Sequence, residues 1–148
     1  ATVQEEVGLR GATTAAYHIQ PDVSVALDTT LAVDIPGSPE QDAVTRLGHG
    51  TAIKIFDSSQ LSNYKLVRHF RNLAAQQGIK YQLEVLPRGG TDGGAMQRVR
   101  EGSPSITLST PSRYVHTVNE MVHQADVEAS IALLTRYLED AHNGDYSL

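Results

Sequence analysis

The amino-acid sequence predicts an α/β fold in which a sheet carries helices on both faces. Strand-like and helix-like segments alternate along the chain. The former have apolar residues at every second position, and the latter have apolar residues at helical spacing. Stretches that contain proline or glycine separate these segments, and there is no internal repeat or low-complexity tract. Strands that alternate with helices are typical of α/β architectures.

The first part of the chain predicts a strand, a helix and a second strand. Residues 1–4 are read as a short strand, and the apolar residues between 7 and 18 recur at helical spacing. Pro21 then breaks the chain. Residues 23–28 alternate large apolar with small side chains, which predicts a buried strand that ends on Asp28.

The middle of the chain predicts a strand, a helix and another strand. Residues 51–56 are a predicted strand that follows a loop with two prolines. Apolar side chains between 63 and 77 lie on one face of a helix, which Gly78 ends. Residues 81–85 alternate cleanly, as the residues of a strand do.

The last part of the chain begins with a glycine-rich loop at residues 87–94. A short helix at 95–100 and a strand at 105–109 are predicted next, before an irregular segment. The final helix begins at Asp126 as its N-cap and runs to Ala141, because its apolar residues recur on one face.

The composition excludes several classes of protein. The 148 residues carry 12 Lys and Arg against 17 Asp and Glu, and this net charge of -5 does not suit a nucleic-acid binder. No apolar run is long enough for a membrane helix, so we expect neither a nucleic acid nor a membrane as partner. Because cysteine is absent, disulfides, thiolate metal sites and cysteine nucleophiles are excluded.

Polar features follow several of the predicted strands. Glu5 and Glu6 come after the first strand, Asp28 ends the second, the loop 89–92 follows a third, and His116 follows a fourth. Ligands bind α/β sheets beyond the carboxyl ends of the strands. We therefore expect these features to converge on one site.

The converging side chains favour a metal site. The neighbouring carboxylates Glu5 and Glu6 repel each other unless a cation or a shared proton lies between them. A metal ion is the simpler solution, with one glutamate as ligand, the other as proton acceptor and Asp28 as a hard oxygen ligand. Each residue also has an ordinary alternative: solvated glutamates, Asp28 as a turn cap, and His116 as a surface residue.

The glycine-rich loop is not a nucleotide-binding motif. It lacks the Lys-Ser/Thr pair of a P-loop and the spacing of a dinucleotide fingerprint. Gly89 and Gly90 instead allow the backbone to come close to a ligand, and Asp92 caps the helix that follows; a plain tight connection is the alternative. Because no G-x-S-x-G nucleophile elbow occurs either, metal-assisted hydrolysis is the leading interpretation.

Four segments of the chain closely resemble the M42 family of metallo-aminopeptidases, which includes the tetrahedral and glutamyl aminopeptidases. In the family's order, they are TVQEEVGLRGA at 2–12, ALDTTLAVDIPG at 26–37, RGGTD at 88–92 and PSRYVHT at 111–117. The resemblance implies that residues 1–148 are the C-terminal portion of the catalytic domain, within a mixed-sheet, three-layer α/β/α zinc-peptidase fold. It also implies a cytoplasmic hydrolase that removes N-terminal residues from peptides and forms homo-oligomers when full length.

The resemblance also implies roles for individual residues. Glu5 would be the general base for the attacking water. The ligands of two divalent ions, zinc or cobalt, would be Glu6, Asp28 and His116. The substrate would lie beside Gly89, Gly90 and Asp92. Two further ligands, a His and an Asp, would precede this sequence, together with the rest of the catalytic domain and a dimerisation domain.

Two alternatives stay open. The chain is a non-catalytic fragment if three ligands spread over two ions leave a weak, open site. Some members of the family are labelled glucanases, so a glycosidase is the other alternative. That reading requires two opposed carboxylates, and an aromatic content of 5% with no tryptophan gives no sign of a sugar-stacking cleft.

Overall fold

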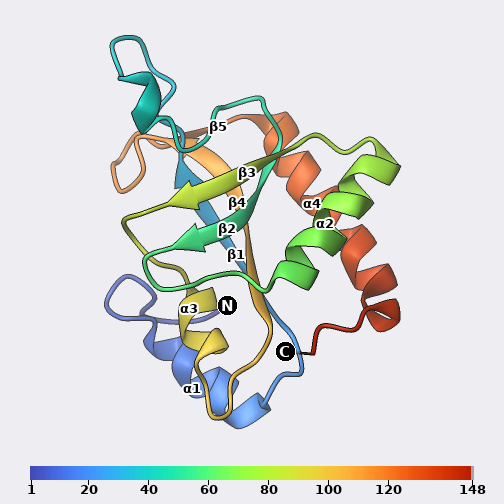
Figure 1. The fold of residues 1–148 in the computed structure, drawn as a ribbon. Helices are drawn as coiled ribbons and strands as arrows, with labels where there is room; N and C mark the ends of the chain where they lie inside the picture. Colours follow the sequence, from blue (N-terminus) through green and yellow to red (C-terminus); the bar gives the residue numbers. More distant parts are fainter. Residues whose placement is uncertain (148) are drawn as a thin grey trace.

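The computed structural model describes residues 1–147, and Figure 1 shows their fold. The helices and strands are α1 (Arg10–Ile19), β1 (Ser24–Leu31), β2 (Thr51–Asp57), α2 (Tyr64–Gln77), β3 (Tyr81–Leu86), α3 (Asp92–Gln97), β4 (Ser105–Arg113), β5 (Met121–Val122) and α4 (Gln124–Asp140). Short 3-10 helices lie at Glu40–Asp42 and Ala141–Asn143. No helix among residues 1–147 is long and apolar enough to cross a membrane.

The strands of the described chain form one mixed sheet in the order β1-β4-β2-β3, with β5 paired to β4. β1 and β4 are parallel, and so are β2 and β3. β2 and β4 are antiparallel, and their register joins Ala52 to Ser109 and Ile53 to Leu108. The pair β2-β3 therefore runs against the pair β1-β4, and this short contact holds the two pairs together.

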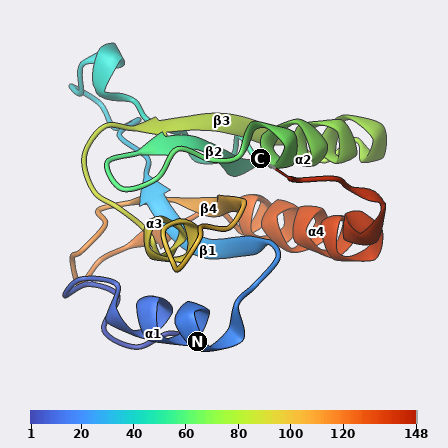
Figure 2. The same ribbon diagram turned by 60° about the horizontal axis from the view of Figure 1, so that its bottom comes forward.

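Helices cover both faces of the sheet, as the sequence predicts. α2 and α4 contact β2 and β4, whereas α3 contacts β1 and β4 and is covered by α1. Figure 2 shows α2 beside α4 and, apart from them, α3 beside α1. Alternate residues of β4 serve the two faces, because Ile106 and Leu108 join the core under α2 and α4 while Thr107 lies against Gly93 of α3. The mixed, three-layer α/β fold is thus confirmed.

The helix predicted at residues 63–77 supplies much of the core. Leu66 and Phe70 are fully buried, and Phe70 stacks on Tyr137 of α4 with ring centroids 4.4 Å apart. Asn63 is the N-cap of α2, where its side chain accepts hydrogen bonds from two backbone amides. Gly78 ends the helix in the left-handed conformation, as predicted.

The N-terminal segment differs from the prediction. Residues 1–4 form no strand; the chain turns back on itself, and the Gly11 amide donates a hydrogen bond to the Val3 carbonyl at 2.9 Å. A Cβ at Gly11 would lie 2.5 Å from the Val3 backbone, so only glycine permits this approach. As a result, α1 begins at Arg10.

β1 and β4 are longer than predicted. Their parallel pairing continues through Leu31 and Ser112, so β1 runs three residues past Asp28. Asp28 therefore lies inside a strand, and the prediction that it ends the strand is wrong. The extension is formed by polar residues such as Thr29 and Thr30, which break the apolar alternation on which the prediction depends.

Asp126 is not the N-cap of the last helix. His123 holds that position, and its ring nitrogen Nδ1 accepts a hydrogen bond from the Ala125 amide at 3.2 Å. Asp126 lies in the first turn and is fully buried, and its carboxylate accepts hydrogen bonds from the Gly48 and Gly50 amides, both at 2.7 Å. It therefore fastens the loop before β2 to α4.

The short helix α3 begins at Asp92, three residues before the predicted start. Thr91 is its N-cap, so the prediction that Asp92 caps this helix is wrong. Gly93 and Gly94 form its first turn, although glycine disfavours helix. Packing explains this, because a Cβ at Gly93 would lie 2.0 Å from Gln60 and one at Gly94 would lie 2.2 Å from Ser59.

A buried ionic cluster joins three strands of the sheet. Lys54, Asp57 and Glu84 are fully buried, and Lys54 Nζ donates a hydrogen bond to Glu84 Oε1 while lying 3.7 Å from Asp57 Oδ2. Thr30 of β1 donates a hydrogen bond to the same oxygen of Glu84 at 2.6 Å. One ammonium group therefore lies between two carboxylates in the interior.

Replacing Lys54 with Met leaves Glu84 and Asp57 buried without their cation. We expect the free energy of unfolding to fall by about 3–5 kcal/mol, the usual cost of breaking a buried ion pair on one side. The double variant Lys54→Met/Glu84→Leu recovers most of this loss, because Asp57 keeps its hydrogen bonds from Ser59 and Gln60. Urea unfolding measures both variants, and a Lys54→Met chain as stable as the parent would contradict the expectation.

Candidate active site

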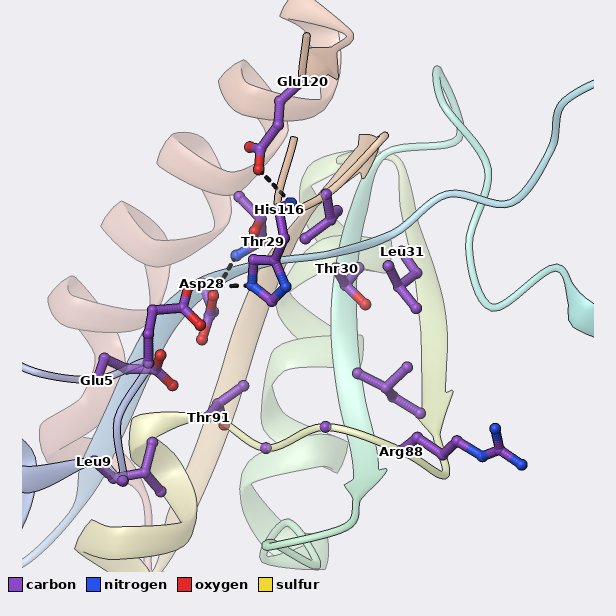
Figure 3. Close-up of a pocket in the computed structure, with 16 residues that line it drawn as sticks. Glu5, Leu9, Asp28, Thr29, Thr30, Leu31, Arg88, Thr91, His116 and Glu120 are labelled. Atoms are coloured by element: carbon purple, nitrogen blue, oxygen red, sulfur yellow. Dashed lines mark hydrogen bonds and ion pairs between the residues drawn. The ribbon is translucent and has the colours of Figure 1, made fainter. Parts of the chain in front are cut away.

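One pocket gathers residues from four separate segments of the chain. Its volume is about 530 Å³, within the usual range of ligand sites. The lining comes from the segment before α1, the second half of β1, the loop after β3 and the loop after β4. Figure 3 shows the side chains of these segments around a common space.

Six of the seven predicted site residues line this pocket, and they are Glu5, Glu6, Asp28, Gly89, Gly90 and His116. The seventh, Asp92, lies beside the pocket as the first residue of α3. Its carboxylate accepts a hydrogen bond from the Thr2 hydroxyl through Oδ2, while Oδ1 is buried and has no hydrogen-bond partner among the described residues. Asp92 thus braces the N-terminal segment against the glycine-rich loop.

The residues do not meet beyond a shared carboxyl edge of the sheet. Because β2 and β3 run against β1 and β4, the carboxyl ends of these strands point to opposite edges. The loop after β3 instead crosses back over the middle of β4, where the hydroxyl groups of Thr91 and Thr107 lie 2.8 Å apart. The pocket consequently lies beside the second half of β1, where the loop after β4 and the returning loop after β3 both reach it. The predicted convergence therefore occurs, but not at one carboxyl edge that all these strands share.

His116 and Glu6 are in direct contact across the pocket. His116 Nε2 lies 3.1 Å from Glu6 Oε1, and both side chains are about 70% exposed. In Figure 3 the imidazole extends from the loop after β4 toward Glu5 and Asp28, which enter from other segments. This end of the pocket therefore combines an imidazole with several carboxylates and is open to a ligand.

The carboxylates of the pocket repel one another. Burial raises the pKa of Glu5, and the charges of Asp28, Glu6 and Asp92 raise it further. Burial also raises the pKa of Asp28, against the lowering effects of a hydrogen bond from the Thr29 amide and of the Lys54 charge. A bound cation would relieve this crowding of negative charge. Crowded carboxylates of this kind are typical of sites that bind a metal ion.

The donor atoms fit a divalent cation, although they do not close a site by themselves. Carboxylate and imidazole groups are the usual ligands of hydrolytic zinc. Nevertheless, no group of three or more such side chains comes together in metal-binding geometry within residues 1–147. The chain therefore offers a contacting pair, Glu6 and His116, with Asp28 in the same pocket.

The floor of the pocket is formed by residues that the sequence does not mark as functional. Thr30 and Thr91 line it, and each donates a hydrogen bond into the buried ionic cluster, Thr30 to Glu84 at 2.6 Å and Thr91 to Asp57 at 3.1 Å. The signal available in the sequence is Lys54 within an otherwise apolar strand. A charge in that setting is seldom buried without partners.

The fold and the pocket define a class of protein, an α/β domain with an acidic, imidazole-containing pocket. The sequence profile of the family described as M42 glutamyl aminopeptidase matches residues 1–133. The lysyl aminopeptidase of Pyrococcus furiosus is 36% identical over 148 residues. The chain belongs to the M42 peptidase family.

Solved structures of related proteins have the same fold. The aminopeptidase APDkam598 from the archaeon Desulfurococcus kamchatkensis is 41% identical, with a TM-score of 0.92 over 95% of this chain. The TET1 peptidase of Pyrococcus horikoshii, which can assemble into a tetrahedron or a large octahedral shell, is 34% identical, with a TM-score of 0.77 over 90% of this chain.

The chain matches only part of each relative. It covers 41% of the Pyrococcus furiosus enzyme, 40% of APDkam598 and 38% of TET1, while almost all of its own length is matched. Activity, substrate and assembly are properties of those longer proteins.

Asp28→Asn tests the electrostatics of the pocket. The pKa of Asp28 is raised in the folded chain, so folding favours the protonated side chain. The contribution of Asp28 to the free energy of unfolding is therefore fully present below its ordinary pKa of about 3.9 and is lost as the pH rises through the folded pKa. In the presence of a chelator, we expect Asp28→Asn to raise the free energy of unfolding at neutral pH. The gain should vanish in acid, and urea unfolding between these limits measures it; a gain that is constant with pH would contradict the assignment.

Proposed function

We propose that residues 1–148 are the C-terminal portion of the catalytic domain of a metal-dependent aminopeptidase. The observation that carries this proposal is the meeting of Glu5, Glu6, Asp28 and His116 in one pocket from three distant segments. Membership of the M42 family and the aminopeptidase names of the relatives support it. In this account the chain supplies the general base and part of the metal site.

Glu5 is the proposed general base. It lies at the wall of the pocket beside Asp28 and Glu6, and burial together with their charges raises its pKa. A carboxylate with a raised pKa is a better proton acceptor for water than an ordinary glutamate. Glu5 can therefore take the proton of the attacking water and return it to the leaving amine.

Glu6, Asp28 and His116 are the proposed ligands of two divalent ions, zinc or cobalt, which are completed by groups from outside this chain. Imidazole and carboxylate donors without thiolates suit these metals in hydrolytic sites. When bound, such ions polarise the scissile carbonyl and lower the pKa of water. The roles of the three side chains are to hold the ions at one end of the pocket and to keep them beside Glu5.

The peptide substrate is proposed to lie along the glycine-rich loop. Gly89 adopts a φ of 87°, and a Cβ at Gly90 would lie 2.8 Å from the Ser59 hydroxyl oxygen. A side chain is therefore disfavoured at each of these two positions, where the backbone lines the pocket. Asp92 would act as a brace of this loop from its position beside the pocket, through its contact with Thr2.

The remainder of the catalytic domain is proposed to pack against the open edges of the sheet. In the described structure β1 pairs with β4 and β3 pairs with β2, so both edges are free. Apolar side chains are exposed on these edge strands, among them Leu27, Leu83 and Val85. The complete protein is proposed to be a cytoplasmic homo-oligomer, and the TET1 assemblies support the oligomer.

Glu5→Gln tests the proposed base in the complete polypeptide that carries this sequence. We expect kcat for release of N-terminal residues from short peptides, with zinc or cobalt supplied, to fall roughly 10²- to 10⁴-fold, the usual contribution of a general base. Glu101→Gln changes an exposed glutamate outside the pocket and should leave the rate unchanged. Equal rates for Glu5→Gln and the parent would refute the role of Glu5.

A non-catalytic fragment is the second candidate. One observation favours it: among the described residues, no three potential ligand side chains lie close enough together to bind one metal ion. Calorimetric titration of the 148-residue chain with zinc separates the two candidates. Tight binding at two sites would argue against the fragment. Weak binding that is lost in His116→Ala is expected if the chain holds only part of the site.

A further inference from the structure

The backbone around His116 is held in an unfavourable conformation. Tyr114 has a φ of 61° and His116 a φ of 64°, both in the left-handed region that side chains disfavour. Such residues keep this conformation only where their surroundings impose it. Residues 114–120, called the His116 loop below, connect β4 to β5, and the pairing of Arg113 with Met121 closes the loop at its base.

A side chain of the same loop contacts the His116 backbone. The Glu120 carboxylate accepts a hydrogen bond from the His116 amide at 2.7 Å (Figure 3). This distance is typical of a hydrogen bond to an ionised acceptor. The hydroxyl and the amide of Thr117 donate to the Tyr114 carbonyl at 2.6 and 3.1 Å, which braces the first half of the loop. Of these contacts, the one from Glu120 acts on His116 itself.

We propose that Glu120 is a positioning residue that acts through His116. Its carboxylate holds the left-handed backbone of His116 and thereby directs the imidazole into the pocket, where Nε2 lies 3.1 Å from Glu6 Oε1. In Figure 3 the carboxylate of Glu120 faces the His116 backbone, whereas Glu5 and Asp28 lie at the far side of the imidazole. The consequence for metal binding rests on the proposed function; the effect on the backbone does not.

A positioning role for Glu120 requires different chemistry from direct contact with the substrate. Glu120 also lines the pocket, so its alternative role is to bind a substrate amine or a cation through its negative charge. Positioning requires only an oxygen that accepts the His116 amide, and the side-chain carbonyl of glutamine supplies one. Glu120→Gln therefore keeps the positioning role and loses the charge, whereas Glu120→Ala loses both.

The first measurement is exchange of the His116 amide with solvent, followed by NMR on the 148-residue chain without metal. We expect exchange in Glu120→Ala to be roughly tenfold faster than in the parent, as loss of a hydrogen bond to a charged group predicts. Glu120→Gln should stay close to the parent. The matched control Glu128→Ala removes an exposed glutamate that accepts a hydrogen bond from the Gln124 side chain, and it should change nothing at His116.

The second measurement is zinc titration of the same variants by calorimetry. We expect Glu120→Ala to bind as weakly as His116→Ala and Glu120→Gln to bind like the parent. If His116→Ala binds zinc like the parent, the proposed function fails, while the exchange data still decide the role of Glu120. The proposal is overturned if Glu120→Gln is as impaired as Glu120→Ala, which would assign the role to charge, or if Glu120→Ala exchanges like the parent.

Discussion

The buried ammonium group of Lys54 is the interaction on which the rest of the site depends. It lies between Glu84 and Asp57 with no exposure to solvent. Through these partners it supports two threonines of the pocket floor, Thr30 on β1 and Thr91 at the start of α3. The antiparallel contact between the two halves of the sheet is short, so this cluster fixes the distance between the walls of the pocket.

The same cluster shapes the electrostatics above it. Lys54 is a cation that the structure places under a pocket crowded with carboxylates, and its charge lowers the pKa of Asp28 against the larger effect of burial. Burial and the mutual repulsion of the carboxylates outweigh this effect, because the pKa values of Glu5 and Asp28 both stay raised. A divalent ion bound among these carboxylates would relieve their repulsion, and His116 adds a nitrogen donor.

Much of the fold could be predicted because the core helices and inner strands carry strong apolar periodicity, as at residues 63–77. The extension of β1 could not, since Thr29 and Thr30 are polar where the strand borders the pocket. The predicted site residues are recognisable by type, yet the approach of the glycine-rich loop to Asp28 and His116 depends on the antiparallel contact of β2 with β4, which rests on two residue pairs. The contact of Glu120 with the His116 amide leaves no pattern in the sequence, because almost any polar loop residue can accept such a bond.

X-ray absorption at the zinc edge of the zinc-loaded chain shows whether this pocket binds metal, because it reports the ligand atoms themselves. If His116 is a metal ligand, we expect oxygen and nitrogen neighbours at about 2.0–2.2 Å with the scattering signature of one imidazole, and loss of that signature in His116→Ala. An imidazole signature that persists in His116→Ala, or a zinc ion surrounded only by water oxygens, would contradict this role of His116.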